Sequence, residues 1–470
     1  MFGLDTPLTI LLLVCLLAVV AFEFINGFHD TANAVATVIY THTLKPSVAV
    51  ILSGILNFTG VLVGGIAVAM GIVNLLPTEA LVDQNIYHGL AMILALLLTA
   101  IIWNLGTWYL GIPCSSSHTL IGSIFGVGIA YMLLPGSHAI ALNWKKISDT
   151  GLSLLISPIF GFGLSFLLML LLPRIIKNKK LYNEPVDKKA PPLWIRSLLI
   201  FTCMSVSYSH GSNDGQKGVG LIMIILIGLV PVHFALDHSK SPEKLLASTQ
   251  KIELSINKID TLSFSKEDKK AYVALQTKTD SVISYLKGIK TFENLQDKKH
   301  FEIRKSILLI TKKADALVAN KGKAMSRIDD KELASFKSEI KEIKEYTEYA
   351  PWQVKLMVSL ALGLGTMIGW RRIVVTIGEK IGKSHLTYAQ GATAELVAAS
   401  TITASSMFGL PVSTTHVLTS GVAGAMTAQS GKGNLQMKTI KNIAIAWIVT
   451  LPVTIILSAV LFLLLRMLMG

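Results

Sequence analysis

Charged side chains are scarce in this sequence of 470 residues, in which Asp, Glu, Lys and Arg make up only 15% of the positions. Soluble proteins carry about 25%, whereas 51% of this chain is hydrophobic. Cysteine is rarer still, and the three cysteines lie inside apolar segments without the spacing of metal ligands or of a disulfide framework. These deficits exclude an ordinary cytosolic enzyme and indicate a chain that lies mostly within a membrane.

The formal net charge of +14 does not indicate nucleic-acid binding, because much of the charge is concentrated in two segments. Residues 237–350 hold 23 Lys/Arg and 18 Asp/Glu, and residues 174–196 hold 7 and 2, which leaves 13 and 9 for the other 333 positions. Basic connecting segments are typical of the cytoplasmic side of membrane proteins. We therefore expect the lipid bilayer to be a partner of this chain, and we expect no nucleic acid.

Apolar stretches of about 20 residues predict an all-α polytopic membrane protein with about ten crossings, or more if some segments are re-entrant. The stretches lie near 7–25, 47–70, 89–110, 119–134, 152–173, 197–230, 354–370, 386–408, 417–428 and 442–466. Lys and Arg mark the cytoplasmic side, so the basic loop 174–196 is expected inside. Counting crossings from this loop puts both the N-terminus and the C-terminus on the extracytoplasmic side.

Two motifs occur twice, which predicts an inverted repeat. GFHDTAN at 27–33 matches GSNDGQK at 211–217 with an offset of 184, and GIPCSSSH at 111–118 matches GLPVSTTH at 409–416 with an offset of 298. The offsets differ by 114, the length of the polar segment 237–350. The predicted order is a first membrane repeat (1–173), a cytoplasmic loop (174–196), the start of the second repeat (197–236), an inserted domain (237–350) and the rest of the second repeat (351–470).

The inserted segment has its own pattern, in which apolar residues recur at helical spacing between mixed charges. The isoleucines that show this pattern are Ile252, Ile256, Ile259, Ile303, Ile307 and Ile310. A small bundle of amphipathic helices is predicted. The orientation count places it on the extracytoplasmic face, either as a solvated cap or as a partner-binding or regulatory domain.

Asp30 and Asp214 occupy equivalent places in the first pair of motifs, inside predicted spans. A carboxylate there usually faces a partner or a water-filled path, and inverted repeats bring such residues to one site near the midplane. Glycines could let the helices unwind and free carbonyls for Na⁺, or a proton could bind the Asp. The residues assigned to this cation site or to its support are Asp30, Asn33, His29, Asp214, Asn213, Gln216 and Lys217. The alternative is simple pairing, for example of Asp214 with Lys217.

The second pair of motifs predicts an oxyanion site. Pro113 and Pro411 are each expected to end a helix, and Ser/Thr runs precede the next apolar segments. Hydroxyls and unpaired N–H groups at a helix N-terminus attract anions, although such runs can also simply pack or bond to backbone. The runs are Ser115, Ser116 and Ser117 in the first half and Ser413, Thr414 and Thr415 in the second. His118 and His416 follow them and could orient the hydroxyls or relay protons.

GFHDTANAVATVIY, SSSHTLIG, SHGSNDGQKG, GWRR and PVSTTH, in this order, resemble the inorganic phosphate transporter (Pit) family, and most closely its bacterial low-affinity carriers. The resemblance covers both membrane halves, about 350 residues. It implies phosphate symport, with Asp30 and Asp214 in cation coupling and residues 115–117 and 413–415 on the oxyanion. His29 stands where many relatives carry Asn, which resembles the proton-coupled branch that accepts metal–phosphate complexes. A homodimer in the bacterial inner membrane is also implied.

Electrical work supports coupling, because HPO₄²⁻ entering against 100 mV costs about 4.6 kcal/mol at about 2.3 kcal/mol per charge. We therefore predict a secondary carrier with alternating access, coupled to H⁺ in preference to Na⁺, with phosphate carried alone or with a divalent metal. No cofactor and no resident metal site are predicted. The alternatives are a sulfate carrier, a passive anion channel and a membrane enzyme, and the last lacks a nucleophile motif such as G-x-S-x-G.

Overall fold

The computed structural model describes residues 2–75, 86–134, 144–185, 189–259, 264–319 and 329–469, without the side chains of residues 31–33, 144–147 and 319. Its regular elements within these ranges are helices, apart from an isolated β-bridge between Gly382 and Leu435. The chain divides into two compact units. We call residues 4–225 and 350–470 the membrane unit, and residues 1–3 and 226–349 the inserted unit.

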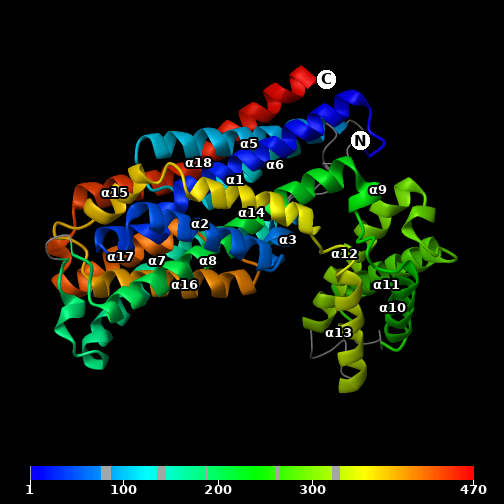
Figure 1. Ribbon diagram of the computed structural model, residues 1–470. Coiled ribbons are helices and arrows are strands. Elements are labelled where there is room, and N and C mark those ends of the chain that lie inside the picture. The colour runs from blue at the N-terminus through cyan, green and yellow to red at the C-terminus, as the bar shows by residue number, and fades with distance from the viewer. Residues whose placement is uncertain are drawn as a thin grey trace. The chain divides into compact units, whose positions relative to one another are not determined.

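The membrane unit is a bundle whose helices lie side by side along one direction (Figure 1). Its N-terminal half contains α1 (Thr6–Tyr40), α2 (Pro46–Val63), α3 (Ala67–Val73), α5 (Ile86–Tyr109), α6 (Ser116–Met132), α7 (Trp144–Ile175) and the 3-10 helix η1 (Lys179–Tyr182). Its C-terminal half contains α8 (Leu193–Leu229), α14 (Trp352–Thr366), α15 (Arg371–Glu379), α16 (Tyr388–Met407), α17 (Thr414–Ser430), η3 (Lys432–Asn434) and α18 (Met437–Met469).

Within the described residues, five helices are long and apolar enough to cross a membrane: α1, α2, α5, α7 and α18. The pair α14 and α15, bent by 63°, makes a sixth if the two count as one broken span. This confirms an all-α membrane protein, while the count of about ten crossings stays a prediction. The helices α6 and α17 have only 17 residues each, which at 1.5 Å per residue is about 26 Å and is short for a full span.

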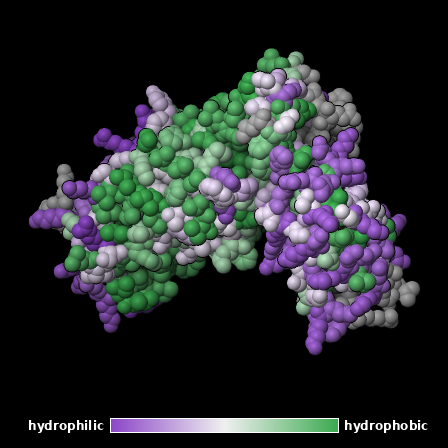
Figure 2. All heavy atoms as spheres, turned by 45° about the vertical axis from the view of Figure 1, so that its right-hand side comes forward, coloured by the Kyte–Doolittle hydropathy of each residue, from purple (hydrophilic) through white to green (hydrophobic). Residues whose placement is uncertain are grey.

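The outer face of the membrane unit is apolar, as expected for contact with lipid. Large exposed hydrophobic side chains include Leu17, Ile159 and Ile448, which are 68, 70 and 72% exposed. Figure 2 shows hydrophobic residues over much of this unit and hydrophilic residues at the end that carries α15 and the loop after α7. Such an apolar surface with a polar end is stable in a bilayer but not in water.

Glycines bring the helices of the membrane unit into close contact at the two Asp motifs. A Cβ on Gly27, three residues before Asp30, would lie 2.4 Å from the Leu362 carbonyl oxygen of α14. A Cβ on Gly211, three residues before Asp214, would lie 2.2 Å from the Asn57 carbonyl oxygen of α2. The same motif position therefore fixes α1 against α14 and α8 against α2, which sets where the two carboxylates stand.

The inserted unit contains the short helix α9 (Pro231–Phe234), α10 (Pro242–Ile256), α11 (Lys266–Leu286), the 3-10 helix η2 (Phe292–Asn294), α12 (Asp297–Ala319) and α13 (Asp330–Lys344). The six isoleucines that predicted amphipathic helices are buried in its core. Arg304 is also buried, and its Nη1 donates to the carbonyl oxygens of Ala235 and Thr347 at 3.1 and 2.7 Å. This guanidinium joins the chain entering the unit to the chain leaving it.

Candidate functional site

The two Ser/Thr runs begin helices, as the sequence predicts. The side chain of Ser115 caps α6 by accepting from His118 N, and the side chain of Ser413 caps α17 by accepting from His416 N. Each preceding helix ends two residues before a glycine with positive φ, at Gly111 (66°) and Gly409 (65°). The prolines lie two residues beyond these glycine turns, so the turns rather than the prolines end α5 and α16.

Asp30 lies where the two helix starts meet. Ser116 Oγ, from α6, donates to Asp30 Oδ2 at 2.8 Å, and Thr415 Oγ1, from α17, donates to Asp30 Oδ1 at 2.8 Å. His29 Nδ1 is 3.1 Å from Asp30 Oδ1, and its Nε2 is 3.2 Å from Thr107 Oγ1. The carboxylate is 2% exposed. One aspartate of the first half is thus held by hydroxyls from both halves of the chain.

Asp214 shares this location and is paired with a buried lysine. Lys217 Nζ lies 2.7 Å from Asp214 Oδ2, and both residues are fully buried. Lys217 also donates to Ser117 Oγ, and Ser117 Oγ donates to the Val412 carbonyl oxygen at 2.8 Å. Ser116 Oγ is 3.5 Å from Asp214 Oδ2, so it stands between the two carboxylates. The pairing of Asp214 with Lys217 that was weighed as the alternative is therefore present, and it lies beside Asp30.

His210 completes the cluster, although sequence reasoning gave it no role. Its Nε2 lies 3.7 Å from Asp30 Oδ2 and 3.7 Å from Asp214 Oδ2. Its Nδ1 is 2.8 Å from Asn57 Oδ1. Its spacing in the sequence could have assigned it to the site, because His210 precedes Asp214 by four residues and so lies on the same face of α8.

Asp30, His210 and Asp214 bring one ligand atom each to within 4.8 Å of one another. Carboxylate oxygens and an imidazole nitrogen are donors that suit a proton or a divalent cation. We call Asp30, His210, Asp214, Lys217 and Ser116 the central cluster.

The two motif histidines lie together beside this cluster. The rings of His118 and His416 have centroids 4.3 Å apart, and the His416 ring stacks on Trp447 at 3.9 Å. His118 Nδ1 is 2.9 Å from Ser115 Oγ, so this histidine orients a capping hydroxyl. The stack ties the start of α6 to the start of α17 through ring contacts.

Two residues assigned to the cation site lie elsewhere. Asn213 Nδ2 donates to Ser406 Oγ at 2.8 Å, on α16, and Gln216 Oε1 accepts from the backbone N–H of Val68, at the start of α3. The side chain of Asn33 is outside the part of the structure that is described.

The unwinding that the glycines could allow does not occur at either Asp motif. The helices α1 and α8 run without a break through both Asp motifs. A continuous helix keeps its carbonyls in intrahelical hydrogen bonds, which withholds them from a cation.

Two further carboxylates are buried in the membrane unit, and one of them, Glu23, packs against Gly218, the residue after Lys217. Glu23 Oε2 accepts from Asn26 Nδ2 at 3.2 Å, and Glu395 Oε2 accepts from Thr202 Oγ1 at 2.5 Å. Both glutamates are fully buried.

An apolar helical bundle with buried charges at the meeting point of two helix starts defines a membrane transport protein. A model of the phosphate transporter family matches residues 26–458. The low-affinity inorganic phosphate transporters PitA and PitB of Escherichia coli (strain K12) are 40 and 41% identical to this chain, over 98% of it and 97% of each relative. The chain therefore belongs to the phosphate transporter family and is a transporter, not an enzyme.

A more distant relative and a solved structure extend these comparisons. A probable low-affinity inorganic phosphate transporter of Bacillus subtilis (strain 168) is 30% identical over 98% of both chains. A solved structure described as a sodium-dependent phosphate transporter has the same fold, with a TM-score of 0.54 and 22% identity, over 97% of this chain and 99% of that one.

Proposed function

We propose that this protein takes up inorganic phosphate by cation-coupled symport with alternating access, with H⁺ as the favoured coupling ion and Na⁺ as the alternative. Family membership supports the substrate. The observation that supports coupling is that Ser116 and Thr415, from the two helix starts assigned to the oxyanion, both donate to Asp30. Phosphate and the ionised Asp30 carboxylate thus compete for the same two hydroxyl donors.

This competition provides a coupling mechanism. The hydroxyls assigned to phosphate are occupied by the Asp30 carboxylate, so phosphate must displace that carboxylate to bind them. A proton or a cation on Asp30 removes its negative charge and weakens its hold on both donors, because hydrogen bonds to an ionised acceptor are about twice as strong as neutral ones. Cation binding at Asp30 therefore releases Ser116 and Thr415 for phosphate.

The charge balance of the site also requires that a cation bind together with phosphate. The central cluster holds the carboxylates of Asp30 and Asp214 and one ammonium, that of Lys217, which pairs with Asp214, so a phosphate dianion added here without a cation would meet an excess of negative charge. Unpaired charges of one sign in a buried site are unfavourable by several kcal/mol. Protonated or cation-bound Asp30 removes this barrier, and it also offsets the work of moving phosphate against the membrane potential.

His210 widens the choice of cation that the site can hold. With its Nε2 facing both carboxylates, the set Asp30, His210 and Asp214 can bind a proton or a divalent metal. A metal held there would also attract phosphate directly, which is how a metal–phosphate complex would travel. In that case the metal is cargo that moves with the phosphate.

The test is uptake of labelled phosphate into liposomes that contain the purified protein, under an imposed pH gradient or an imposed Na⁺ gradient. Asp30→Asn and Asp214→Asn are compared with Glu395→Gln, which removes a buried carboxylate outside the central cluster. We expect accumulation under the pH gradient, its loss in both Asp variants and its survival in Glu395→Gln. Divalent metal is added and withheld in parallel, to separate free phosphate from a metal complex.

Each contrary outcome has a defined meaning. Accumulation driven only by Na⁺ would overturn the coupling ion and keep the site. Flux without a gradient that persists in both Asp variants would indicate a passive channel. Accumulation of sulfate in place of phosphate would overturn the substrate.

We place the protein in the bacterial inner membrane with both termini extracytoplasmic, on the basis of the basic loop 174–196, and we expect a homodimer. Labelling of single introduced cysteines near each terminus by a membrane-impermeant reagent in intact cells tests the orientation. Labelling only after the cells are broken open would reverse it.

A further inference from the structure

A second polar pocket lies in the membrane unit, between the end of α5 and the start of α15. Its volume is about 610 Å³, within the range of small-molecule sites. Two glycine turns border it, at Gly111 after α5 and at Gly369 before α15, with φ of 66° and 74°. The GWRR motif of the sequence, at residues 369–372, forms one wall. The central cluster does not include any of these residues.

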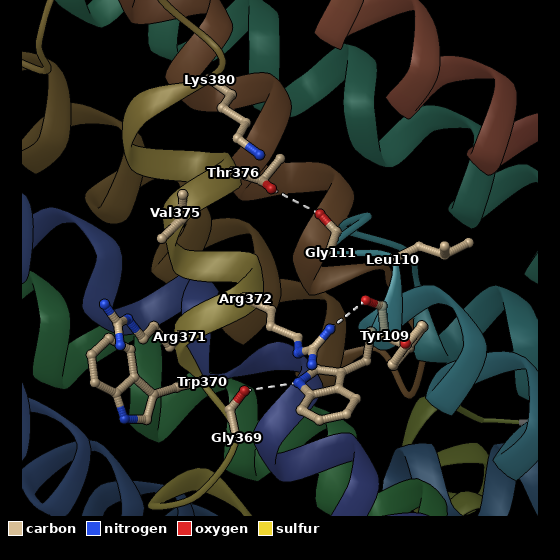
Figure 3. Close-up of a pocket in the computed structure, with 11 residues that line it drawn as sticks. Tyr109, Leu110, Gly111, Gly369, Trp370, Arg371, Arg372, Val375, Thr376 and Lys380 are labelled. Atoms are coloured by element: carbon tan, nitrogen blue, oxygen red, sulfur yellow. Dashed lines mark hydrogen bonds between the residues drawn. The ribbon is translucent and has the colours of Figure 1, made fainter.

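Three hydrogen bonds hold the two walls of the pocket together (Figure 3). Arg372 Nη1 donates to the Tyr109 carbonyl oxygen at 2.7 Å, and Thr376 Oγ1 donates to the Gly111 carbonyl oxygen at 2.8 Å. Trp108 Nε1 donates to the Gly369 carbonyl oxygen at 2.8 Å. The Arg372 guanidinium also lies over the Trp108 and Tyr109 rings, 5.0 and 4.8 Å from their centroids. The pocket is therefore a fixed frame.

The charge of the pocket is positive. Arg371, Arg372 and Lys380 are among its lining residues, and the described lining includes no carboxylate. Figure 3 shows Arg372 and Lys380 extending toward the α5 wall, whereas Arg371 lies beside Trp370 at the other side of the start of α15. Glu379, which is next to Lys380 in the chain, lines a separate hollow together with Arg371. Arg372 and Lys380 thus face the pocket without a compensating negative charge.

We propose that this pocket is a second anion site, which binds a phosphate group between Arg372 and Lys380. One of the five guanidinium N–H groups of Arg372 is used by Tyr109, and the ammonium of Lys380 has no hydrogen-bond acceptor among the described residues. Guanidinium and ammonium groups are the usual protein partners of phosphate. The phosphate group belongs either to inorganic phosphate or to the headgroup of an anionic phospholipid.

The position of the pocket fits both sources. Trp108 and Tyr109 are the aromatic residues typical of the membrane–water interface, and basic pockets between membrane helices bind lipid headgroups. The pocket also lies near the central cluster, because Trp108 follows Thr107, whose hydroxyl is 3.2 Å from Nε2 of His29, the residue before Asp30. Occupation of the pocket by inorganic phosphate would place a substrate anion near the central cluster.

Chemical footprinting of lysines tests the site without measuring transport. The full-length protein in detergent is treated with an amine-acetylating reagent, and mass spectrometry reports modification of Lys380 and of exposed Lys383, which lies outside the pocket. The probes are inorganic phosphate, phosphatidylglycerol and zwitterionic phosphatidylcholine, whose headgroup has no amine that the reagent could acetylate. At a probe concentration ten times its Kd, single-site occupancy should lower the modification rate of Lys380 about tenfold and leave that of Lys383 unchanged.

The outcomes separate the two sources. Protection by inorganic phosphate alone supports a soluble anion, protection by phosphatidylglycerol alone supports a lipid headgroup, and protection by both supports the shared phosphate chemistry. Protection of Lys380 by none of the probes, or of Lys383 to the same extent, would overturn the site.

Two substitutions sharpen the test. Arg372→Gln should abolish the protection of Lys380, whereas Arg371→Gln removes the same charge from the neighbouring position and should preserve it. Equal loss in both variants would show only a general positive field and would overturn the site. If Arg372→Gln does not fold, because Arg372 bridges the two walls, protection of Lys380 in the wild-type protein and in Arg371→Gln still decides the question.

Discussion

Removing one partner of the buried pair Asp214–Lys217 should destabilise the protein more than removing both. The pair is fully buried, with Lys217 Nζ 2.7 Å from Asp214 Oδ2. Asp214→Asn leaves the Lys217 ammonium without the carboxylate that it contacts, and Lys217→Gln leaves the Asp214 carboxylate without its cation. The cost of such an uncompensated buried charge is about 3–5 kcal/mol. The double variant Asp214→Asn/Lys217→Gln leaves neither charge.

The expected magnitude follows from this cost. A loss of 3–5 kcal/mol lowers the ratio of folded to unfolded protein by about two to nearly four orders of magnitude at 1.36 kcal/mol per decade. In a double-mutant cycle the two single losses should sum to clearly more than the loss in the double variant, because contacting residues couple by about 0.5–3 kcal/mol or more. The double variant should regain stability and still fail to transport phosphate, since Asp214 is absent.

The assay uses the three cysteines, Cys15, Cys114 and Cys203, which are all buried thiols. A thiol-reactive fluorescent dye reports thermal unfolding of the detergent-purified protein as these thiols become exposed. The expected order of melting temperature is wild type, then the double variant, then the two single variants. Wild-type stability in Lys217→Gln, or a double variant that melts below both single variants, would refute the ion pair.

Three further predictions concern separate parts of the chain. Ser116→Ala should lower phosphate uptake in liposomes at least about tenfold, since a hydrogen bond to a charged group contributes about 1.5–3 kcal/mol. The control is Ser123→Ala in the same helix, where the hydroxyl donates to the Thr119 carbonyl oxygen, and this variant should leave uptake unchanged. Gly211→Ala should lower the melting temperature because its Cβ would lie 2.2 Å from a carbonyl oxygen, whereas Gly151→Ala, with open space around it, should not lower it. Burial lowers the pKa of His300 below its usual 6.5, so the unfolded form binds the proton more readily than the folded form. The free energy of unfolding of the inserted unit should therefore fall by up to about 1.4 kcal/mol per pH unit below pH 6.5. Hydrogen exchange of α12 in the full-length protein should show this pH dependence, and His300→Gln should weaken it.

The helix starts of the site were predictable from local chemistry alone. Ser115 and Ser413 cap α6 and α17 because a hydroxyl after a glycine turn satisfies the first free N–H groups of the next helix. The amphipathic isoleucines of the inserted unit were predictable for a similar reason, since their spacing of three or four residues places them on one helix face.

The membership of the central cluster was harder to predict, because the glycines left open whether the helices unwind at the Asp motifs. In a continuous helix the residue next to Asp214 points about 100° away, and the residue two positions on points to the opposite face. Asn213 and Gln216 therefore contact α16 and α3, whereas His210 and Lys217, at spacings of four and three, face the same site as Asp214.

The contacts of Asp30 with Ser116 and Thr415 join residues 86 and 385 positions apart. Periodicity describes one helix at a time and carries no information on which helices pack together. The matching motifs indicated that the two halves are related, but they could not show that both Ser/Thr runs converge on a single carboxylate. The same holds for the glycine contacts of α1 with α14 and of α8 with α2, which join helices far apart in the sequence.

Equilibrium binding of phosphate tests most directly whether cation and phosphate share the central cluster. Labelled phosphate is titrated onto the purified protein at several pH values, and proton uptake on phosphate addition is measured in the same buffer. The account predicts that lower pH raises phosphate affinity, that phosphate binding takes up protons to the extent that linkage requires, and that Asp30→Asn abolishes both effects. Phosphate affinity that is the same at every pH and at every Na⁺ concentration, with an unchanged value in Asp30→Asn, would contradict it.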